Sequence, residues 1–313
     1  MGEPWRAWLV TGGPVGPLVE ALRALPDQDA LDHAASLVTQ QLPTGRHREL
    51  AAALEGEPWM RRALDRAGSR VWWRRLDAAR ALSVVGGPGD TALLLRLIDD
   101  PFPAVQAVAT RSISNVADAA TVRYVVDRLP RRTHVVRVSQ YRALRDVWAL
   151  AAPALLDRLS PASTATPDCV AVWVALAGAL EVPACVAACV PLAQHADARV
   201  RIAVARVLKS YYHPTAESAL RALLDDPDWR VRGQAARSLG ALRAADAVPA
   251  LVAAMRDQSW WVRFRAGLSL TQIGEPGRQA LRELRLTSDR YGADMATMIS
   301  GLSDGGVTEL AEL

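Results

Sequence analysis

Arginines recur at regular intervals along this chain, and their guanidinium groups could bind acidic ligands. One set is separated by steps of 31, 31, 64 and 31 residues: Arg80, Arg111, Arg142, Arg206 and Arg237. Guanidinium groups form bidentate hydrogen bonds with carboxylates and phosphates. If folding aligns these side chains, they could bind an acidic protein surface or a nucleic acid.

A second set of arginines points to a structural role. It is accompanied by aspartates that precede the same segments: Arg75, Arg137, Arg201, Arg232 and Arg263, with Asp100, Asp226 and Asp257. An arginine one turn into a helix can reach the carboxylate of a neighbouring unit through bidentate hydrogen bonds. We therefore assign this ladder to the alignment of successive units and not to ligand binding.

Both sets follow a repeat of about 31 residues. The pair Val-Arg recurs at Val200, Val231 and Val262, and the same step backwards reaches Cys169, then Val136, Val105 and Arg74 after a shift of two residues. Eight residues after each of these stands an apolar or small residue: Leu82, Ile113, Leu144, Ala177, Leu208, Leu239 and Leu270. A period in this range is typical of a solenoid, in which neighbouring units bury a shared core.

Each unit is predicted to be a helical hairpin. In one unit, residues 216–224 form a short amphipathic helix, and Asp225-Asp226-Pro227 supplies a capping carboxylate and a proline for the start of a second helix. That second helix extends to about Leu239, and Gly240 is available to end it. Residues 160–167 form an insertion that explains the shift in period.

The repeat divides the chain into three parts. Residues 1–65 are predicted to be an irregular N-terminal helical cap, residues 66–288 the repeats, and residues 289–313 a C-terminal capping helix and tail. The fold class expected is all-α: a right-handed α-solenoid of about seven helical hairpins between irregular ends.

Two stretches carry a resemblance to a known family. The pattern Asp-Asp-Pro-Asp-Trp-Arg-Val-Arg-x-x-Ala-Ala-x-x-Leu-Gly at 225–240 and Trp-Trp-Val-Arg-Phe-Arg-Ala at 260–266 resemble bacterial HEAT-repeat proteins of the phycobilisome-lyase HEAT-like type. The resemblance implies the solenoid fold, with the second helix of each hairpin lining a concave surface. It covers scaffolds, chromophore lyases and other enzymes, so it does not select one function. Some similar members stand beside membrane glycosyltransferases, which implies a membrane-associated enzyme as one partner.

On such a surface the first set of arginines would form a row. Taking each repeating Val-like residue as zero, all five stand at +6, nearly opposite the apolar stripe of positions 0, +4 and +8. Arg145 and Lys209 at +9 flank the row, and Trp73 and Trp261 at −1 are candidate apolar anchors. The alternative is a solvated helix face, because Lys209 is the chain's single lysine and arginine serves as the general basic residue.

Composition narrows the functional classes. The chain has 313 residues, 50% of them hydrophobic, and a net charge of +4, which does not by itself require a nucleic acid partner. Three cysteines, Cys169, Cys185 and Cys189, form no paired set, which favours buried thiols and a reducing, cytoplasmic location. Neither a secretory signal nor a membrane span is expected, because Glu181 and Pro183 divide the apolar stretch at 170–193.

No catalytic constellation stands out, and neither a metal nor a cofactor is expected. The five histidines lie in different units, and phosphate-loop, nucleophile-elbow and zinc motifs are missing. The sequence therefore favours a non-catalytic scaffold that binds an acidic protein partner through the arginine row. Nucleic acid is the alternative ligand. An alkylpurine DNA glycosylase of HEAT-like type would combine Trp73, Asp77 and Arg80, and a chromophore-lyase-like subunit is the second alternative.

Overall fold

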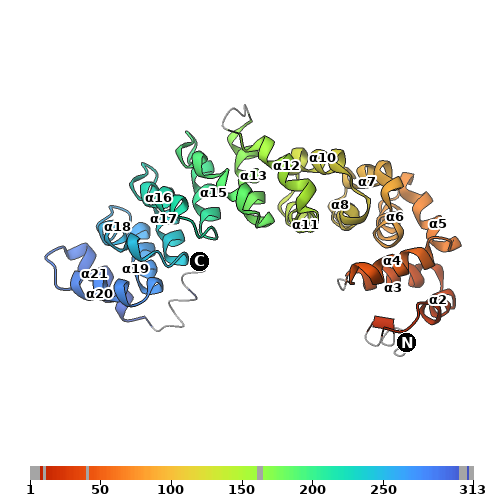
Figure 1. Ribbon diagram of the computed structural model, residues 1–313, viewed down its shortest axis with the longest axis horizontal. Coiled ribbons are helices and arrows are strands. Elements are labelled where there is room, and N and C mark those ends of the chain that lie inside the picture. Colours follow the sequence, from red (N-terminus) through yellow and green to blue (C-terminus); the bar gives the residue numbers. More distant parts are fainter. Residues whose placement is uncertain (1–7, 10–11, 40–41, 161–164, 303–308, 310–313) are drawn as a thin grey trace. The chain divides into compact units, whose positions relative to one another are not determined.

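The structure is a computed structural model that describes residues 8–9, 12–39, 42–160, 165–302 and 309. Every regular element among these residues is a helix (Figure 1), so the predicted all-α helical-repeat fold is confirmed. The chain divides into two compact units, residues 1–154 and 155–313, and each is described by itself. Residues 161–164 of the predicted insertion lie outside the described residues, and the boundaries expected at 65/66 and 288/289 remain predictions.

Unit 1 begins with helices that have a core of their own and continues with helical hairpins. Its helices are α2 (Gly16–Arg23), α3 (Asp27–Thr39), α4 (Thr44–Leu54), α5 (Pro58–Asp65), α6 (Trp72–Val85), α7 (Thr91–Ile98), α8 (Pro103–Ala109), α9 (Ile113–Val116), α10 (Ala119–Arg128) and α11 (His134–Asp146), and α12 (Trp148–Arg158) crosses into unit 2. The second helices α6, α8 and α11 pack in sequence, and α7 and α10 form another row (Figure 1). The second helix that contains Val105 is interrupted at Thr110, whose hydroxyl donates to the carbonyl of Gln106 and so favours a bend.

Unit 2 repeats the hairpin more regularly. Its helices are α13 (Pro167–Leu180), α14 (Pro183–Ala187), α15 (Ala198–Leu208), α16 (Pro214–Ala222), α17 (Trp229–Ala241), α18 (Val248–Ala254), α19 (Trp260–Ile273), α20 (Glu275–Leu284) and α21 (Arg290–Ser300). The second helices α13, α15, α17 and α19 pack each against the next, while α16 and α18 form a separate row (Figure 1). The last pair, α20 and α21, packs on α19.

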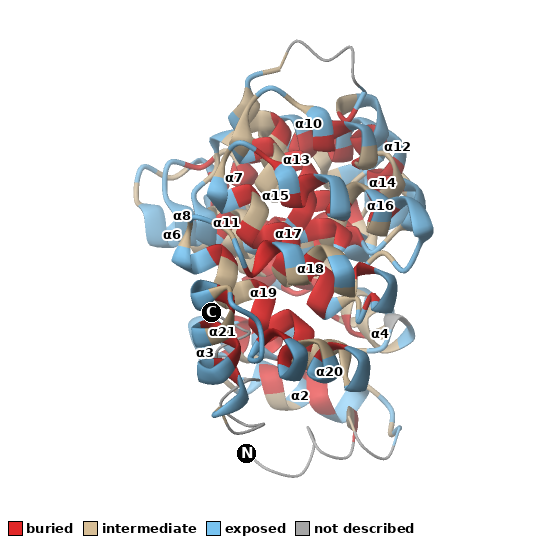
Figure 2. Cartoon of the chain, turned by 90° about the vertical axis from the view of Figure 1, so that its left-hand side faces the viewer, coloured by how far each residue is buried: buried red, intermediate tan, exposed pale blue. Residues whose placement is uncertain are grey.

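The core of each unit is formed by the repeating apolar positions. The valines Val105, Val136, Val200, Val231 and Val262 are completely buried, as are all seven residues that stand eight positions after each repeat start. Figure 2 shows the buried residues of α17, α18 and α19 where these helices face one another, with exposed residues at the turns. Burying a valine or leucine contributes about 1.5–3 kcal/mol, so the hairpins are stabilised chiefly by their neighbours.

The residues that cap and end α17 differ from those expected. Asp228, and not Asp226, caps the helix, because its carboxylate accepts the N–H of Arg230 at 2.9 Å. The helix also passes through Gly240 and ends at Ala241, and Arg243 then takes the left-handed backbone conformation with φ 51°. The prediction that Gly240 ends the helix was wrong, since tertiary packing and not helix termination requires glycine there.

Close packing of α17 on α19 explains Gly240. A Cβ atom at this position would lie 2.5 Å from Oε1 of Gln272 and 2.6 Å from the Cβ and Oγ of Ser269. Ser269 is itself fixed, because its hydroxyl donates to the carbonyl of Ala236 at 2.8 Å. The absent side chain therefore sets how closely these two helices approach.

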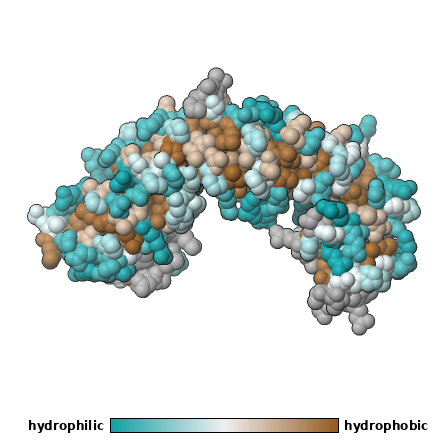
Figure 3. Space-filling model, viewed as in Figure 1, coloured by the Kyte–Doolittle hydropathy of each residue, from teal (hydrophilic) through white to brown (hydrophobic). Residues whose placement is uncertain are grey.

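Figure 3 shows patches of hydrophobic residues between hydrophilic ones on the visible face of each unit. Among the described residues, no helix combines the length and apolar character needed to cross a membrane.

We predict that Gly240→Ala destabilises the protein by about 1–3 kcal/mol, because the added methyl group forces α17 and α19 apart. Gly233→Ala is the matched control on the same helix: its Cβ would lie 3.4 Å from the flexible Arg265 side chain and 3.8 Å from Cγ2 of Val262, both ordinary contacts. The control should be neutral or stabilising by up to about 1 kcal/mol, since alanine favours helix. Urea denaturation followed by circular dichroism measures both. A stabilised Gly240→Ala variant would contradict the packing argument.

Candidate binding surface

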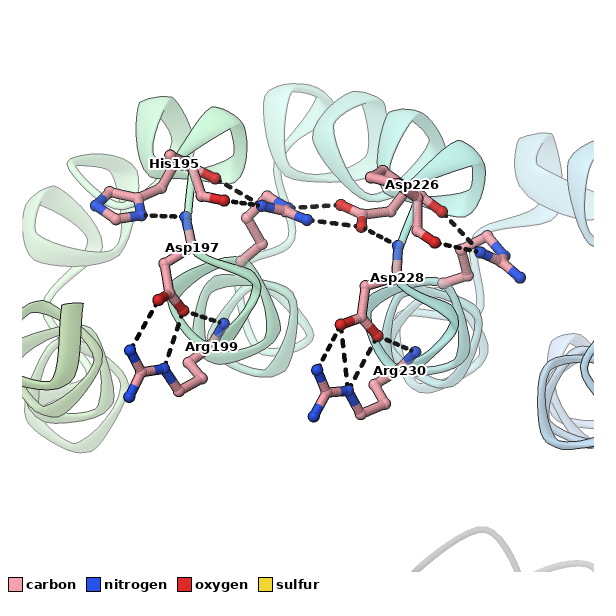
Figure 4. Close-up of polar contacts among 10 residues, drawn as sticks. His195, Asp197, Arg199, Asp226, Asp228 and Arg230 are labelled. Atoms are coloured by element: carbon pink, nitrogen blue, oxygen red, sulfur yellow. Dashed lines mark hydrogen bonds and ion pairs between the residues drawn. The ribbon is translucent and has the colours of Figure 1, made fainter.

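Arg201 connects two successive hairpins of unit 2 through contacts with His195 and Asp226, both labelled in Figure 4. Its Nε and Nη2 atoms donate to the two carboxylate oxygens of Asp226 at 2.6 and 2.8 Å, and Nη1 donates to the carbonyls of His195 and Ala196, each at 2.8 Å. The carboxylate also accepts the backbone N–H of Asp228 at 2.8 Å. The pair is nearly buried, and these additional bonds offset the desolvation of its charges.

The same connection recurs at two other places. Arg232 donates to Asp257 at 2.6 and 2.9 Å, and in unit 1 Arg75 donates to Asp100 at 2.5 and 3.0 Å. In all three cases the aspartate stands 25 residues after the arginine. The ladder residues therefore hold adjacent hairpins together and are not available to a ligand.

Two members of the predicted ladder have no carboxylate at that spacing. The residue 25 positions after Arg137 is Ala162, and the one after Arg263 is Ser288. Arg263 instead donates to the carbonyl of Asp257 at 2.7 Å, and its guanidinium lies 5.1 Å from the ring centre of Tyr291. The ladder of unit 2 thus ends on an aromatic ring.

The carboxylate of Asp257 shows the electrostatics of these pairs. Burial raises the pKa of Asp257, but the hydrogen bonds from Arg232 and from the N–H of Ser259 outweigh burial and hold the pKa below its ordinary value. The same hydrogen bond raises the pKa of Arg232. The folded state therefore favours the ionised pair.

Three arginines from successive second helices of unit 2 come together. Arg206 on α15 and Arg237 on α17 belong to the predicted row, and Arg265 on α19 joins them. Burial lowers the pKa of Arg265, and the positive charges of Arg237 and Arg206 lower it further. Among the described residues, neither Arg206 nor Arg265 has a carboxylate within ion-pair distance. We call Arg206, Arg237 and Arg265 the arginine surface.

The arginine surface departs from the predicted row at α19. The +6 position of this helix is Leu268, which is buried. Arg265 precedes it by three residues on a neighbouring part of the helix surface, with its Cδ 3.4 Å from where a Cβ of Gly233 would lie. Sequence reasoning missed Arg265 because it searched a single repeat position. The buried leucine in place of arginine was the signal that could have found it.

Aromatic side chains lie at the start of the same helix. Trp261 is 53% exposed and meets Trp260 edge to face, with ring centres 5.0 Å apart, while Trp260 stacks on Phe264 at 4.9 Å. Trp261 and Arg265 are one turn apart, so an exposed ring and a cation occupy one side of α19. Such a ring is suited to be an apolar anchor beside charged contacts.

The arginines at −1 in unit 2 are engaged by their own helix caps. Arg199 binds the carboxylate of Asp197 at 2.8 Å, and Arg230 binds that of Asp228 at 2.5 Å (Figure 4). Hydrogen bonds from Arg199 lower the pKa of Asp197 to about 2. Lys209 is exposed at the end of α15. Arg199 and Arg230 are therefore neutralised by the capping aspartates of their own helices.

In unit 1 the first two arginines of the predicted row bind other side chains of the same unit. Arg80 donates to Asp32 at 2.8 Å and to Asp77 at 3.3 Å, and Arg111 donates to the hydroxyl of Thr39 at 2.9 Å. Asp32 and Thr39 both lie on α3, in the N-terminal region that the repeat does not describe. Arg80 is thus partly neutralised by the chain itself.

The other candidates of unit 1 lie at the surface. Arg142 and Arg145 are exposed on α11, and Trp73 is exposed at the start of α6. Trp73 meets Trp72 edge to face at 6.1 Å, and Trp72 stacks on Phe102 at 5.5 Å. Aromatic clusters therefore mark the starts of second helices in both units.

Asp77 is buried between α6 and the N-terminal helices. Its carboxylate accepts from Gln28 at 3.2 Å and from Arg80 at 3.3 Å, and Nη1 of Arg66 lies 3.8 Å away. Trp73, Asp77 and Arg80 do lie on the same helix, α6, as the DNA glycosylase alternative requires. The carboxylate, however, faces the chain's own arginines and not an open surface.

The cysteines and histidines do not gather at a common site in the described ranges. Cys185 and Cys189 are buried, and the Cys189 thiol donates to the carbonyl of Cys185 at 3.4 Å. Burial, followed by the neighbouring Cys185, raises the pKa of Cys189 to about 12, which makes it a poor nucleophile. No group of three or more His, Cys, Asp and Glu side chains could hold a metal in the part of the chain that the structure describes.

The comparisons with known proteins agree with the repeat architecture. Residues 152–232 and 216–298 match the HEAT-repeat family. Residues 152–298 therefore consist of HEAT repeats. No curated protein matches the sequence significantly.

Several solved structures are similar at low identity. An engineered protein shares 18% identity, with 94% of this chain and 96% of that chain covered and a TM-score of 0.36. YibA of E. coli shares 10% identity, with 89% and 98% covered and a TM-score of 0.41. The complex of CpcE and CpcF of phycocyanin lyase from Nostoc sp. PCC7120 shares 19% identity, with 77% and 92% covered and a TM-score of 0.33. With identities and TM-scores this low, these likenesses carry no argument about activity.

We predict that Asp257→Ala lowers the free energy of unfolding by about 2–4 kcal/mol at pH 7, because it leaves the nearly buried Arg232 without its partner. The folded-state pKa of Asp257 is depressed, so its stabilisation is present above the unfolded pKa and is lost as the pH falls through the folded value. The loss of unfolding free energy caused by Asp257→Ala should therefore become smaller below about pH 4. Urea denaturation at pH 7 and pH 3 measures it. Glu217→Gln, at an exposed pair 4.0 Å apart, is the control and should change stability by less than about 0.5 kcal/mol.

We predict that Arg265→Met stabilises the protein by about 1 kcal/mol, because it replaces a half-buried cation near two like charges with an apolar chain of similar length. The gain should be largest at low salt, where repulsion is least screened. Thermal and urea denaturation at two ionic strengths would test this. A destabilised variant at low salt would show that Arg265 makes a favourable native contact.

Proposed function

We propose that this protein, which contains HEAT repeats, is a scaffold that binds an acidic protein partner through the arginine surface of unit 2. The observation that carries the proposal is the meeting of Arg206, Arg237 and Arg265 from three successive helices, with their charges close enough to repel one another. Like charges held together are unfavourable in the unbound protein, and an anionic partner would relieve that repulsion. Trp261 would supply the apolar anchor beside it.

The contrast between the two sets of arginines supports this proposal. The ladder arginines Arg75, Arg201 and Arg232 are engaged by carboxylates and carbonyls, whereas Arg206 and Arg265 have no carboxylate partner among the described residues. If arginine were used here only as a general polar residue, both sets would be expected to have similar surroundings. The exposed Arg142, Arg145 and Lys209 would add positive charge, each within its own unit.

A protein partner is favoured over nucleic acid because the arginines that flank the arginine surface are engaged by the chain's own carboxylates. Nucleic-acid affinity grows with the number of phosphates contacted along an extended basic track. In unit 2 the flanking Arg199 and Arg230 are held by their capping aspartates. In unit 1, Arg80 is held by Asp32 and Asp77, and this engagement of Asp77 gives no support to the glycosylase alternative.

The test compares two double variants in which the net charge of the protein changes by the same amount. Arg206→Glu with Arg265→Glu should reduce capture of acidic partners by about 10-fold or more, because two attractive charges become repulsive. Arg221→Glu with Arg290→Glu changes the same charge at exposed sites elsewhere in unit 2 and should have little effect. A labelled Glu-rich peptide with one tryptophan and a single-stranded oligonucleotide of equal length serve as probes in fluorescence anisotropy.

The two probes decide between ligand classes. Tighter peptide binding that is lost in the arginine-surface variant, with its circular dichroism unchanged, supports the proposal. Tighter oligonucleotide binding would replace the protein partner with nucleic acid. Equal binding by both double variants would remove the arginine surface as the binding site.

A further inference from the structure

A cavity of about 790 Å³ lies at the C-terminal end of unit 2, within the size range of small-molecule sites. It is formed by the ends of α17, α19 and α21 and by one side of α20. Ile273 and Leu302, both partly exposed, contribute apolar surface, and four arginines line it: Arg243, Arg278, Arg282 and Arg285. We call this the terminal cavity. It does not include Arg206 or Arg265.

The arginines of the terminal cavity exceed the negative charge beside them. Arg278 and Arg282 share one carboxylate, that of Glu275, at 3.2 and 2.5 Å. In the described part of the chain, Arg243 and Arg285 have no carboxylate within ion-pair distance. Among the residues that the structure describes, the four guanidinium groups of the cavity therefore have one carboxylate partner between them.

The backbone at Arg243 is a second, independent observation. This residue follows the end of α17 and has φ 51°, in the left-handed region. The backbone N–H of Arg243 donates to the carbonyl of Gly240, and that of Ala244 donates to the carbonyl of Leu239. Glycine is the usual residue at such a helix end, because it adopts this conformation without steric conflict. An arginine therefore stands, at the edge of the cavity, in a position that glycine usually takes.

We propose that the terminal cavity binds a small organic anion with two negative charges, a phosphomonoester or a dicarboxylate. Guanidinium groups bind both kinds of oxyanion through paired hydrogen bonds. The apolar surface of Ile273 and Leu302 would contact the carbon part of the ligand, which distinguishes it from inorganic phosphate. Arg243 and Arg285 supply the unpaired charges, and Glu275 holds Arg278 and Arg282 in place.

The experiment is calorimetric titration of the full chain with phenyl phosphate, phthalate and inorganic phosphate. We expect saturable binding of at least one organic dianion, at least about 5-fold tighter than inorganic phosphate. Equal affinity for inorganic phosphate would overturn the assignment of an organic ligand. An absence of saturable binding of any probe up to about 10 mM would overturn the site itself.

Variants separate a binding role from a structural one. Arg243→Gly should lower the affinity for the organic dianion about 10-fold or more while leaving the Tm unchanged or raised, because glycine removes the backbone strain. Arg285→Gln should also weaken binding, and Arg221→Gln, on the far helix α16, should not. Unchanged affinity in both cavity variants would mean that these arginines serve only the helix ends.

A further full-chain variant tests the source of the anion. Asp304→Asn, Glu309→Gln and Glu312→Gln remove the carboxylates that follow Leu302, itself a lining residue. Binding of equal affinity in this variant supports an external ligand. Binding seen only in this variant would overturn the proposal, because the chain's own carboxylates would then be the anion.

Discussion

Successive hairpins of unit 2 are held at a fixed spacing and rotation by an arginine in one second helix that reaches an aspartate 25 residues further along the chain. Arg201 and Arg232 each donate to a carboxylate ahead of them and to backbone carbonyls behind them, so each guanidinium joins two turns. Charges that lose water need such complete hydrogen bonding, because an unpaired buried charge is strongly unfavourable. This requirement leaves little freedom in how one hairpin sits on the next. Equivalent positions on α15 and α17 are therefore brought into line.

Alignment has the opposite consequence for the arginine surface. Arg206 and Arg237 are placed at equivalent points of adjacent helices, and Arg265 approaches them from α19, so their charges repel. This repulsion lowers the stability of the stacked hairpins. Such a cost is common at binding sites, where stability and function compete. The same repeat geometry thus produces both a satisfied ladder and a region of unsatisfied charge.

The last hairpins of unit 2 hold most of the departures from the repeat. On α19 the +6 arginine is replaced by Leu268, the ladder arginine Arg263 meets Tyr291 instead of an aspartate, and Trp261 adds to the exposed aromatic cluster. The terminal cavity lies beside these departures, between α19, α20 and α21.

The sequence by itself determined the helical class, the hairpin repeat and the positions that face the core. These depend on periodicity within one unit, and residues such as Val231 and Leu239 repeat at spacings that only a buried helix face explains. The 25-residue interval between ladder arginines and aspartates was likewise visible in the sequence. Its physical basis is short-range: the unit length fixes which turn lies beside which helix.

Only the tertiary structure decided which arginines have partners. Asp32 neutralises Arg80 from a segment outside the repeat, 48 residues away, and no local pattern indicates that contact. The packing distance of α17 on α19 decided that Gly240 lies inside a helix, and the angle of α20 and α21 on α19 created a cavity lined by Arg243. Such features depend on interhelical distances and angles, which arise from the combined packing of many side chains and are not encoded at any single position.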